Sequence, residues 1–213
     1  MMDLSKIGPQ YLDILREVGN IGAGNAATAL SQMLNKTIDM NVPAVRVVPF
    51  KEIGDTVGGE EAVVAAVFLL IEGDAPGNMF FMLPVNEASR FIQQLTGDPS
   101  IDFSDEPLNE MASSALNEVG NILAGSYLSS LSDFTKLNLQ PTPPAIAVDM
   151  TTAILSFGLV ELSRAGDYAI VIDTEINEKN NDDTIRSKGH FFLLPDPDSL
   201  NKILQALGVP LDG

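Results

Sequence analysis

The chain has 213 residues, and its 29 Asp and Glu side chains outnumber its 12 Lys and Arg side chains, which gives a net charge of -17. Nucleic acids and anionic membranes bind through clustered cations, so this balance argues strongly against either as the main partner. The chain has no cysteine and a single histidine, His190, which excludes disulfides, thiol chemistry, histidine-rich metal sites and most catalytic triads.

The first half of the chain is predicted to hold two helices around three strands. Gly8-Pro9 suits a helix start, because proline is favoured in the first turn, and the helix is expected to run to about Leu34. Pro43 is expected to open a strand, and a polar link with three glycines should follow that strand. The predicted strands are 44–50, 62–71 and 79–82, and a helix over 86–95 should stop at Gly97.

The second half repeats this layout. Residues 104–107 are expected to cap a second long helix, because acids there complement its dipole. Strands are predicted at 145–150, 153–162, 168–176 and 191–195, and a closing helix at 198–207. Residues 191–195 echo residues 80–84 at an offset of 111 (191 minus 80). We assign the ten added residues to the polar segment Glu178 to Lys188 and expect it to form a mobile hairpin tip.

The two long predicted helices carry one motif twice. Asp-Ile-Leu-Arg-Glu-Val-Gly-Asn at 13–20 returns as Ser-Ala-Leu-Asn-Glu-Val-Gly-Asn at 114–121, an offset of 101 (118 minus 17). Pro43 and Pro144 each lie 23 residues beyond the motif's asparagine (43 minus 20 and 144 minus 121). Repetition at a fixed offset indicates an internal duplication.

This layout predicts an α+β fold. We expect the halves to pair across a pseudo-two-fold axis and build one continuous β-sheet with the two long helices packed on it. Neither half alone could bury both its helix and its sheet. The link from Gly97 to Phe103 is shorter than a linker between independent domains, so residues 1–213 are predicted to form a single domain with half-repeats at about 8–97 and 104–208.

Each long helix is predicted to have a buried stripe and a polar outer face, on a wheel of about 100° per residue. The predicted buried stripes are Leu15, Val18, Gly22, Ala26, Ala29 and Met33, and Leu116, Val119, Leu123, Tyr127 and Phe134. The predicted outer faces are Asp13, Glu17, Asn20, Gly24 and Thr28, and Ser114, Glu118, Asn121, Gly125 and Ser129. A glycine there costs about 1 kcal/mol of helix stability. Because small residues allow a close approach, these faces are predicted to bind a partner; a plain solvated face is the alternative.

Several familiar sites fit these residues less well. The glycines of residues 19–24 lie inside a helical pattern rather than after a strand, so a nucleotide-binding loop is disfavoured. A carboxylate metal cluster of Asp13, Glu17, Asp105 and Glu118 would lack any Glu-x-x-His motif, so we predict no metal site in this chain. Each outer face has one glutamate beside an asparagine, unlike the paired carboxylates of glycosidases.

Glutamate and asparagine at i, i+3 present a carboxylate and a carboxamide on one helical turn. A carboxamide that orients water serves phosphoryl hydrolysis, in which positioning and charge placement do most of the work. A carboxylate near a phosphoryl group is repelled by about 3 kcal/mol at roughly 6 Å and an effective dielectric near 20. Glu17 and Glu118 therefore require a cation from the partner, which predicts a half-site that another protein completes.

The doubled motif, with its correctly spaced prolines, resembles the CheC-type chemotaxis phosphatases, a family that also includes CheX and FliY. Two copies without an added flagellar-switch domain are most similar to the CheC branch. The resemblance implies hydrolysis of the aspartyl phosphate of the response regulator CheY. It implies that Glu17 and Glu118 pair with the regulator's active-site lysine and that Asn20 and Asn121 orient the attacking water. The Mg²⁺ would belong to the regulator, so this chain needs no cofactor.

The same resemblance implies a second partner, the receptor deamidase CheD, and no motif in the sequence locates its surface. The residues expected to contact the regulator beside the catalytic pairs are Asp13, Gly24, Pro43, Ser114, Gly125 and Pro144. The alternative function is a non-catalytic adaptor that regulates CheD. The Glu/Asn pair in both copies favours an enzyme, since docking alone does not require an asparagine oriented in this way.

Three further expectations concern the whole protein. The start of the chain does not resemble a signal peptide and the longest apolar run, Ala62 to Ile71, is too short to span a bilayer, so we expect a cytoplasmic protein. We also expect a monomer. The second site should work better than the first, because Asp13 adds a negative charge where Ser114 adds none, and because Gly22 replaces Leu123 on the buried stripe.

Overall fold

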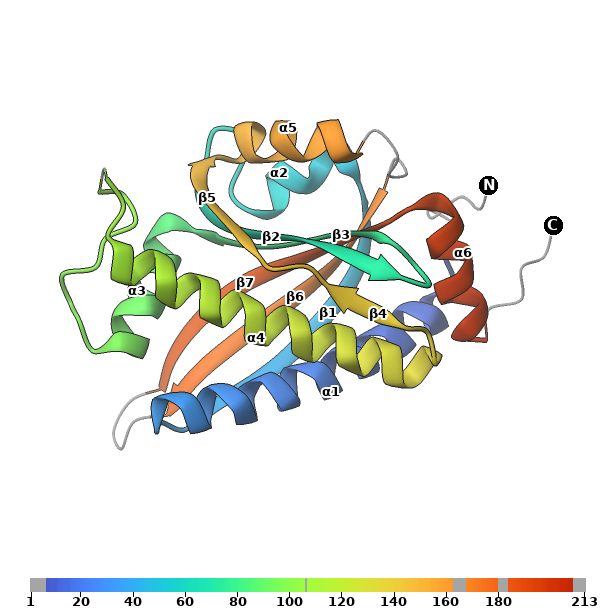
Figure 1. Cartoon of the computed structure of the whole chain (residues 1–213), viewed down its shortest axis with the longest axis horizontal. Coiled ribbons are helices and arrows are strands. Elements are labelled where there is room, and N and C mark those ends of the chain that lie inside the picture. The colour runs from blue at the N-terminus through green and yellow to red at the C-terminus, as the bar shows by residue number, and fades with distance from the viewer. Residues whose placement is uncertain (1–6, 106, 163–167, 180–183, 209–213) are drawn as a thin grey trace.

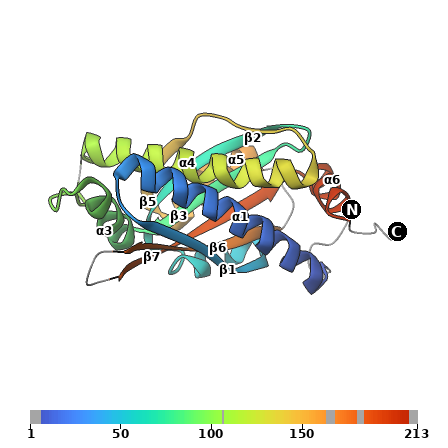
Figure 2. The ribbon, with the colours of Figure 1, turned by 90° about the horizontal axis from the view of Figure 1, so that it is seen from below.

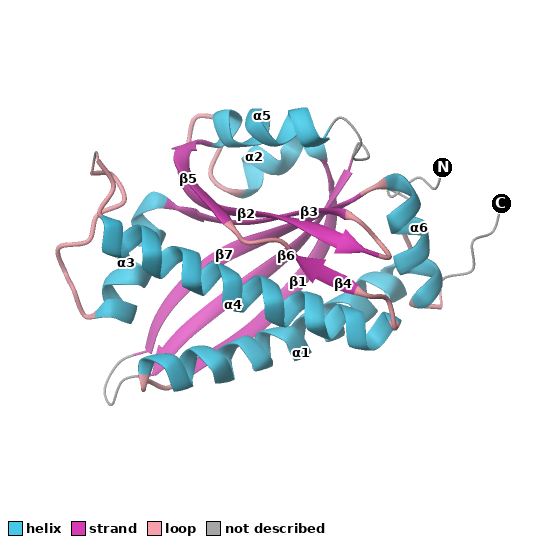
Figure 3. Ribbon diagram, in the orientation of Figure 1, coloured by secondary structure: helices cyan, strands magenta, loops and turns pink. Residues whose placement is uncertain are grey.

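The computed structural model describes residues 7–105, 107–162, 168–179 and 184–208. The helices are α1 (Pro9–Leu34), α2 (Ile53–Thr56), α3 (Val85–Thr96), α4 (Glu110–Thr135), α5 (Thr151–Leu162) and α6 (Pro197–Ala206), with a 3-10 turn η2 (Phe50–Glu52). The strands are β1 (Ile38–Pro49), β2 (Val63–Gly73), β3 (Gly77–Pro84), β4 (Leu139–Pro141), β5 (Ala145–Met150), β6 (Tyr168–Lys179) and β7 (Thr184–Pro195). Figure 3 separates the helices from the strands by colour.

The strands form one antiparallel sheet, in which β1, β6, β7, β3, β2 and β4 are neighbours in that order and β5 also pairs with β2 (Figure 1). The equivalent strands of the two halves are β1 and β5, β2 and β6, and β3 and β7. These equivalent strands occupy mirrored positions in the order β1-β6-β7-β3-β2-β5, counted from its two ends. The predicted α+β fold with a continuous sheet is therefore confirmed, and the sheet order is that expected of two repeats related by a two-fold axis.

Helices cover both faces of the sheet. The long helices α1 and α4 lie against one face, with α3 and α6 at opposite ends of the pair (Figures 1 and 2). Beneath them is the main core, which includes Leu15, Leu30, Leu116, Val67, Phe81, Ile172 and Phe191. The other face carries a smaller core under α2 and α5, which includes Ile53, Val64, Phe80, Ile154, Val171 and Phe192. The two outer faces of α1 and α4 consequently project from the same side of the molecule.

The strand register corrects the predicted insertion. Val67 pairs with Phe81 in the first half and Ile172 pairs with Phe191 in the second, and all four side chains lie in the main core. The structural offsets are therefore 105 (172 minus 67) and 110 (191 minus 81), not 111. The offset between the halves is 101 at the long helices and 105 at β2 and β6, so four residues are added before β6 (105 minus 101). It rises to 110 at β3 and β7, so five more are added in the β6–β7 hairpin (110 minus 105), which gives nine in total. The assignment of ten residues to one segment was wrong.

That polar segment is also less loose than predicted. Glu178 and Ser187 are buried, and β6 and β7 remain paired as far as Lys179 and Thr184. Residues 180–183 lie outside the described residues. The interpretation of 178–188 as a mobile tip was therefore wrong for its described part, because polar residues on a strand can bury one face.

The predicted strand at 153–162 was wrong, because these residues belong to α5. A short apolar run does not distinguish a buried strand from a buried helix by periodicity. Two threonines fix the start of the helix, since Thr151 bonds the carbonyl of Ala62 and Thr152 bonds that of Glu60. Ile154 then covers the smaller core, which would otherwise face solvent.

Two predicted boundaries also change. The cap of α4 is Asn109, whose Oδ1 accepts hydrogen bonds from the backbone N–H groups of Met111 at 2.8 Å and Ala112 at 3.3 Å, so residues 104–107 are not the cap. Strand β1 begins at Ile38, so Pro43 lies inside the strand rather than at its start. The helix α1 has the predicted limits, with Pro9 in its first turn.

The ends of the predicted stripes were wrong. Met33 is 45% exposed and Phe134 is 48% exposed. The axes of α1 and α4 are inclined to each other (Figure 2), so a stripe drawn along the whole helix does not stay in contact with the core. The last buried residue of α1 is Leu30.

Candidate functional site

The two predicted catalytic pairs lie on the outer faces of α1 and α4. Glu17, Glu118 and Asn121 are exposed, and Asn20 is half-buried. Neither glutamate forms an ion pair with any residue that the structure describes. Each carboxylate is therefore available to a cation from outside the chain.

The glycines of these helices divide into two kinds. A Cβ on Gly22 would lie 3.0 Å from Cα of Tyr127, and one on Gly120 would lie 2.5 Å from a methyl carbon of Val67. These two glycines allow close packing inside the protein. A Cβ on Gly24 or Gly125 would meet nothing within 4 Å. Internal packing does not explain this second pair. Each of these glycines lies four residues after the asparagine of its helix and leaves that surface position without a side chain.

The two asparagines have different surroundings. The backbone N–H of Val42 donates a 2.8 Å hydrogen bond to Oδ1 of Asn20, and Nδ2 of Asn20 lies 3.5 Å from the carbonyl oxygen of Val42. The Asn20 carboxamide thus ties α1 to β1. Asn121 makes no side-chain hydrogen bond within the described part of the chain, so its carboxamide faces solvent unengaged.

The other predicted contact residues surround these pairs. Ser114 is exposed on α4, Pro43 is exposed on β1, and Pro144 is half-buried immediately before β5. Asp13 is exposed, but Nη2 of Arg16 lies 3.1 Å from its Oδ1. A surface pair of this kind contributes little stability, yet it offsets the charge of Asp13. The reasoning that Asp13 adds an unbalanced negative charge to the first site was therefore wrong.

The reasoning about Gly22 was wrong as well. Gly22 is not a weak point in the buried stripe, because its lack of a side chain lets the backbone of Tyr127 approach. Burial raises the pKa of Tyr127 to about 12, against the lowering effect of its hydrogen bond with Thr174, 3.0 Å away. The Tyr127 side chain of α4 is thus fixed to β6 beside Gly22.

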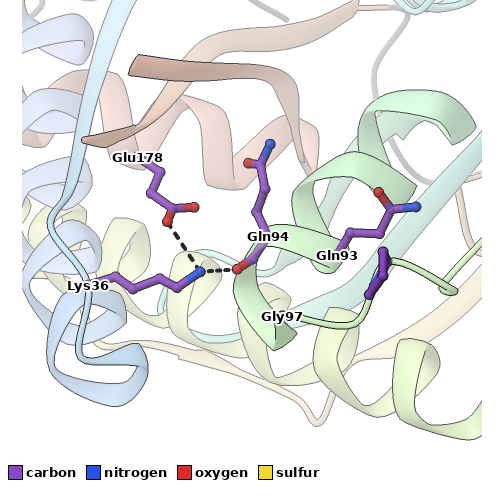
Figure 4. A pocket seen from close by; sticks show the side chains of 6 residues that line it. Lys36, Gln93, Gln94, Gly97 and Glu178 are labelled. Atoms are coloured by element: carbon purple, nitrogen blue, oxygen red, sulfur yellow. Dashed lines mark hydrogen bonds and ion pairs between the residues drawn. The ribbon is translucent and has the colours of Figure 1, made fainter. Parts of the chain in front are cut away.

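Polar side chains away from the two helix faces join elements of the fold through ion pairs and hydrogen bonds. Lys36 donates a hydrogen bond to the carbonyl of Gln94 and lies 3.2 Å from Oε1 of Glu178, at the rim of a hollow of about 380 Å³ (Figure 4). The hydrogen bond joins the segment after α1 to α3, and the ion pair joins it to β6. Because Glu178 is only 6% exposed, Lys36 supplies the charge that its carboxylate requires.

A second cluster of polar side chains joins three strands on the face of the sheet opposite α1 and α4. Asp173 on β6 accepts hydrogen bonds from Arg46 at 2.9 and 3.1 Å, and lies 2.8 Å from Nδ1 of His190. Burial alone would raise the pKa of Asp173, but the hydrogen bonds and charges of His190 and Arg46 outweigh it and lower the pKa to about 2. This single histidine therefore belongs to a structural cluster on three strands.

The part of the chain that the structure describes lacks two further classes of site. Among the described residues, no group of three or more histidine, aspartate or glutamate side chains could hold a metal ion. No helix in the described ranges is both long and apolar enough to cross a membrane.

The chain matches the model of the CheC-like family at residues 11–47 and 111–148, and each match contains one Glu/Asn pair and its proline. It is 49% identical over 205 residues to "CheY-P phosphatase CheC" of Bacillus subtilis, covering 96% of this chain and 97% of that protein. The chain belongs to the CheC-like family. The predicted resemblance is thereby confirmed.

Other relatives of this CheC-like protein share part of the sequence or only the fold. The flagellar motor switch phosphatase FliY of Bacillus subtilis is 31% identical over 134 residues, which are 63% of this chain and 34% of FliY. A crystal structure of Thermotoga maritima FliY matches with a TM-score of 0.74 at 21% identity, covering 95% of this chain and 98% of that one. The FliM middle domain of H. pylori matches with a TM-score of 0.65 at 13% identity, covering 94% of this chain and 99% of that one. At these identities the two structures support the fold alone.

Sequence reasoning missed the part played by Val42. Its partner Asn20 lies 22 residues earlier (42 minus 20), and no local pattern connects a helix residue with a backbone N–H on a strand. The available signal was the residue before each repeated proline, which is Val42 in one copy and Pro143 in the other.

Proposed function

We propose that this CheC-like protein hydrolyses the aspartyl phosphate of a CheY-type response regulator. The observation that carries the proposal is the 49% identity to CheY-P phosphatase CheC over 97% of that protein. Both Glu/Asn pairs lie on outer helix faces, as an enzyme that acts on a folded protein requires.

In the proposed reaction, each pair supplies two groups and the regulator supplies the rest. A carboxamide from Asn20 or Asn121 accepts and donates hydrogen bonds to a water molecule and holds it in line with the phosphorus–oxygen bond that breaks. Glu17 or Glu118 pairs with a lysine of the regulator, and the regulator holds the Mg²⁺ that offsets the phosphoryl charge. This division explains why the exposed glutamates have no cation within the described residues.

The surface around each pair suits such a partner. Gly24 and Gly125 have no neighbour within 4 Å of an added Cβ, although glycine weakens an exposed helix. A helix that must lie against another protein's active site needs such a gap at the contact. Asp13, Ser114, Pro43 and Pro144 are proposed to border the two contacts.

The alternative, an adaptor that regulates the receptor deamidase CheD, shares these helix faces. We propose CheD as a second partner on the grounds of the family resemblance, together with a cytoplasmic location and a monomeric single domain. Binding of purified CheD, measured by calorimetry, tests the second partner. Binding of phosphorylated CheY without any acceleration of phosphate loss would favour the adaptor over the enzyme.

The decisive experiment measures phosphate release from phosphorylated CheY with catalytic amounts of this protein. The wild type should accelerate release, and Asn20→Ala combined with Asn121→Ala should return release to the regulator's own rate. Gln32→Ala, an exposed substitution elsewhere on α1, is the matched control and should behave as the wild type. Stimulated release that persists in the double variant would contradict the water-positioning role.

A further inference from the structure

Each half of the sheet contains a bulge at its repeated proline. In the first half, the pairing of β1 with β6 shifts register between Asn41 and Ala44, so Val42 and Pro43 form the bulge. The bulge turns the backbone N–H of Val42 away from β6 and toward Asn20. In the described sheet, β1 has no other strand on that side.

The second half has the same bulge. The N–H of Thr142 donates a 2.9 Å hydrogen bond to the carbonyl of Leu70, and pairing with β2 resumes where Ala145 meets Phe68. Residues 143–144 therefore stand opposite one residue of β2, as residues 42–43 stand opposite one residue of β6.

The two bulges correspond residue by residue. Val45 and Ile146 both pack against the main core, and their offset of 101 (146 minus 45) equals that of the Glu/Asn motifs. The same offset places Pro143 at the position of Val42 (143 minus 42). Because proline has no backbone N–H, Pro143 cannot make the bond by which Val42 holds Asn20.

We propose that Pro143 is a positioning residue for the second site, because the missing N–H leaves the Asn121 carboxamide free to orient water. This inference rests on the proposed phosphatase function. In the first half, the N–H of Val42 bonds Oδ1 of Asn20, and Nδ2 of Asn20 lies near the carbonyl of Val42, so the Asn20 carboxamide cannot turn toward a water molecule without breaking these contacts. The second site therefore carries most of the turnover, and Asn20 mainly joins α1 to β1.

The test restores the missing donor with Pro143→Ala. A backbone hydrogen bond of ordinary net strength would keep the Asn121 carboxamide bonded to the N–H of residue 143 for most of the time. The kcat should therefore fall about three- to tenfold, with KM for phosphorylated CheY unchanged. Pro141→Ala, which removes an exposed proline from β4, is the control and should leave kcat unchanged. An unchanged or raised kcat in Pro143→Ala would overturn the inference.

Amide hydrogen exchange by NMR gives a readout that does not depend on activity. The Val42 amide should be protected in the wild type and lose protection in Asn20→Ala. In Pro143→Ala, the new amide at position 143 should be protected, and adding Asn121→Ala should remove that protection. An unprotected amide at 143 would refute the inference, whereas a wild type that does not accelerate phosphate loss from CheY would refute the proposed function instead.

Discussion

The difference between the two asparagines predicts that their alanine substitutions have opposite profiles. Asn20→Ala removes the acceptor for the N–H of Val42, a residue that is 3% exposed. A buried donor that loses its partner costs about 1–3 kcal/mol. For a protein of this size, each kcal/mol shifts Tm by roughly 2–4 °C, so a fall of about 2–12 °C is expected.

Asn121→Ala should change stability much less. The side chain makes no hydrogen bond within the described residues, and it is exposed on α4. Replacing an exposed asparagine within a helix by alanine removes nothing and improves helix propensity by about 0.5 kcal/mol. The expected result is a Tm equal to that of the wild type or slightly above it.

Activity should rank the other way. With phosphorylated CheY at saturation, Asn121→Ala should lose more of the stimulated phosphate release than Asn20→Ala. Calorimetric unfolding and phosphate release on the same preparations provide both quantities. Two results would refute the reasoning: an equal Tm for the two variants, or a larger loss of activity from Asn20→Ala than from Asn121→Ala.

Three other predictions test separate parts of the structure. Gly24→Ala with Gly125→Ala should raise the unfolding free energy by about 2 kcal/mol yet weaken calorimetric binding of phosphorylated CheY, whereas Gly22→Ala should destabilise the fold. Asp173 has a folded pKa of about 2, below its unfolded value, so its stabilisation is present above about pH 4 and disappears as the pH falls toward 2. Asp173→Asn should therefore lose about 2 kcal/mol at pH 7, and its urea midpoint should fall less than that of the wild type between pH 4 and pH 2. Lys36→Met should destabilise the protein by about 3 kcal/mol, because it leaves a buried carboxylate unpaired, and an equal urea midpoint would contradict that role.

The duplication made much of the fold predictable. A motif repeated at a constant offset requires two similar halves, and apolar strands with two amphipathic helices leave few ways to bury both. The start of α1 at Pro9 and the stop of α3 at Gly97 followed from proline and glycine signals, which act locally. The α+β class and the outward position of Glu17 and Glu118 needed nothing more.

The errors arose where distant segments decide local structure. Residues 153–162 have an apolar pattern that either a strand or a helix could bury. They form a helix because that part of the chain covers the smaller core. Residues 178–188 are polar enough for a loop, but the ion pair of Glu178 with Lys36 packs part of that segment. No pattern within the segment contains the lysine that stabilises it.

The candidate site was predictable as a set of residues but not as a set of contacts. The sequence contains Asn20 and Asn121 in identical motifs, and a motif cannot indicate that one carboxamide is already hydrogen-bonded. That difference lies at position 42 and its counterpart 143, where valine provides an N–H and proline does not. In the proposed reaction, the Asn20 carboxamide has to break its hydrogen bond with Val42 in order to turn toward the water, so stability and the proposed catalysis compete for Asn20. The proposed role of Pro143 removes this competition from the second site, because proline offers the Asn121 carboxamide no N–H.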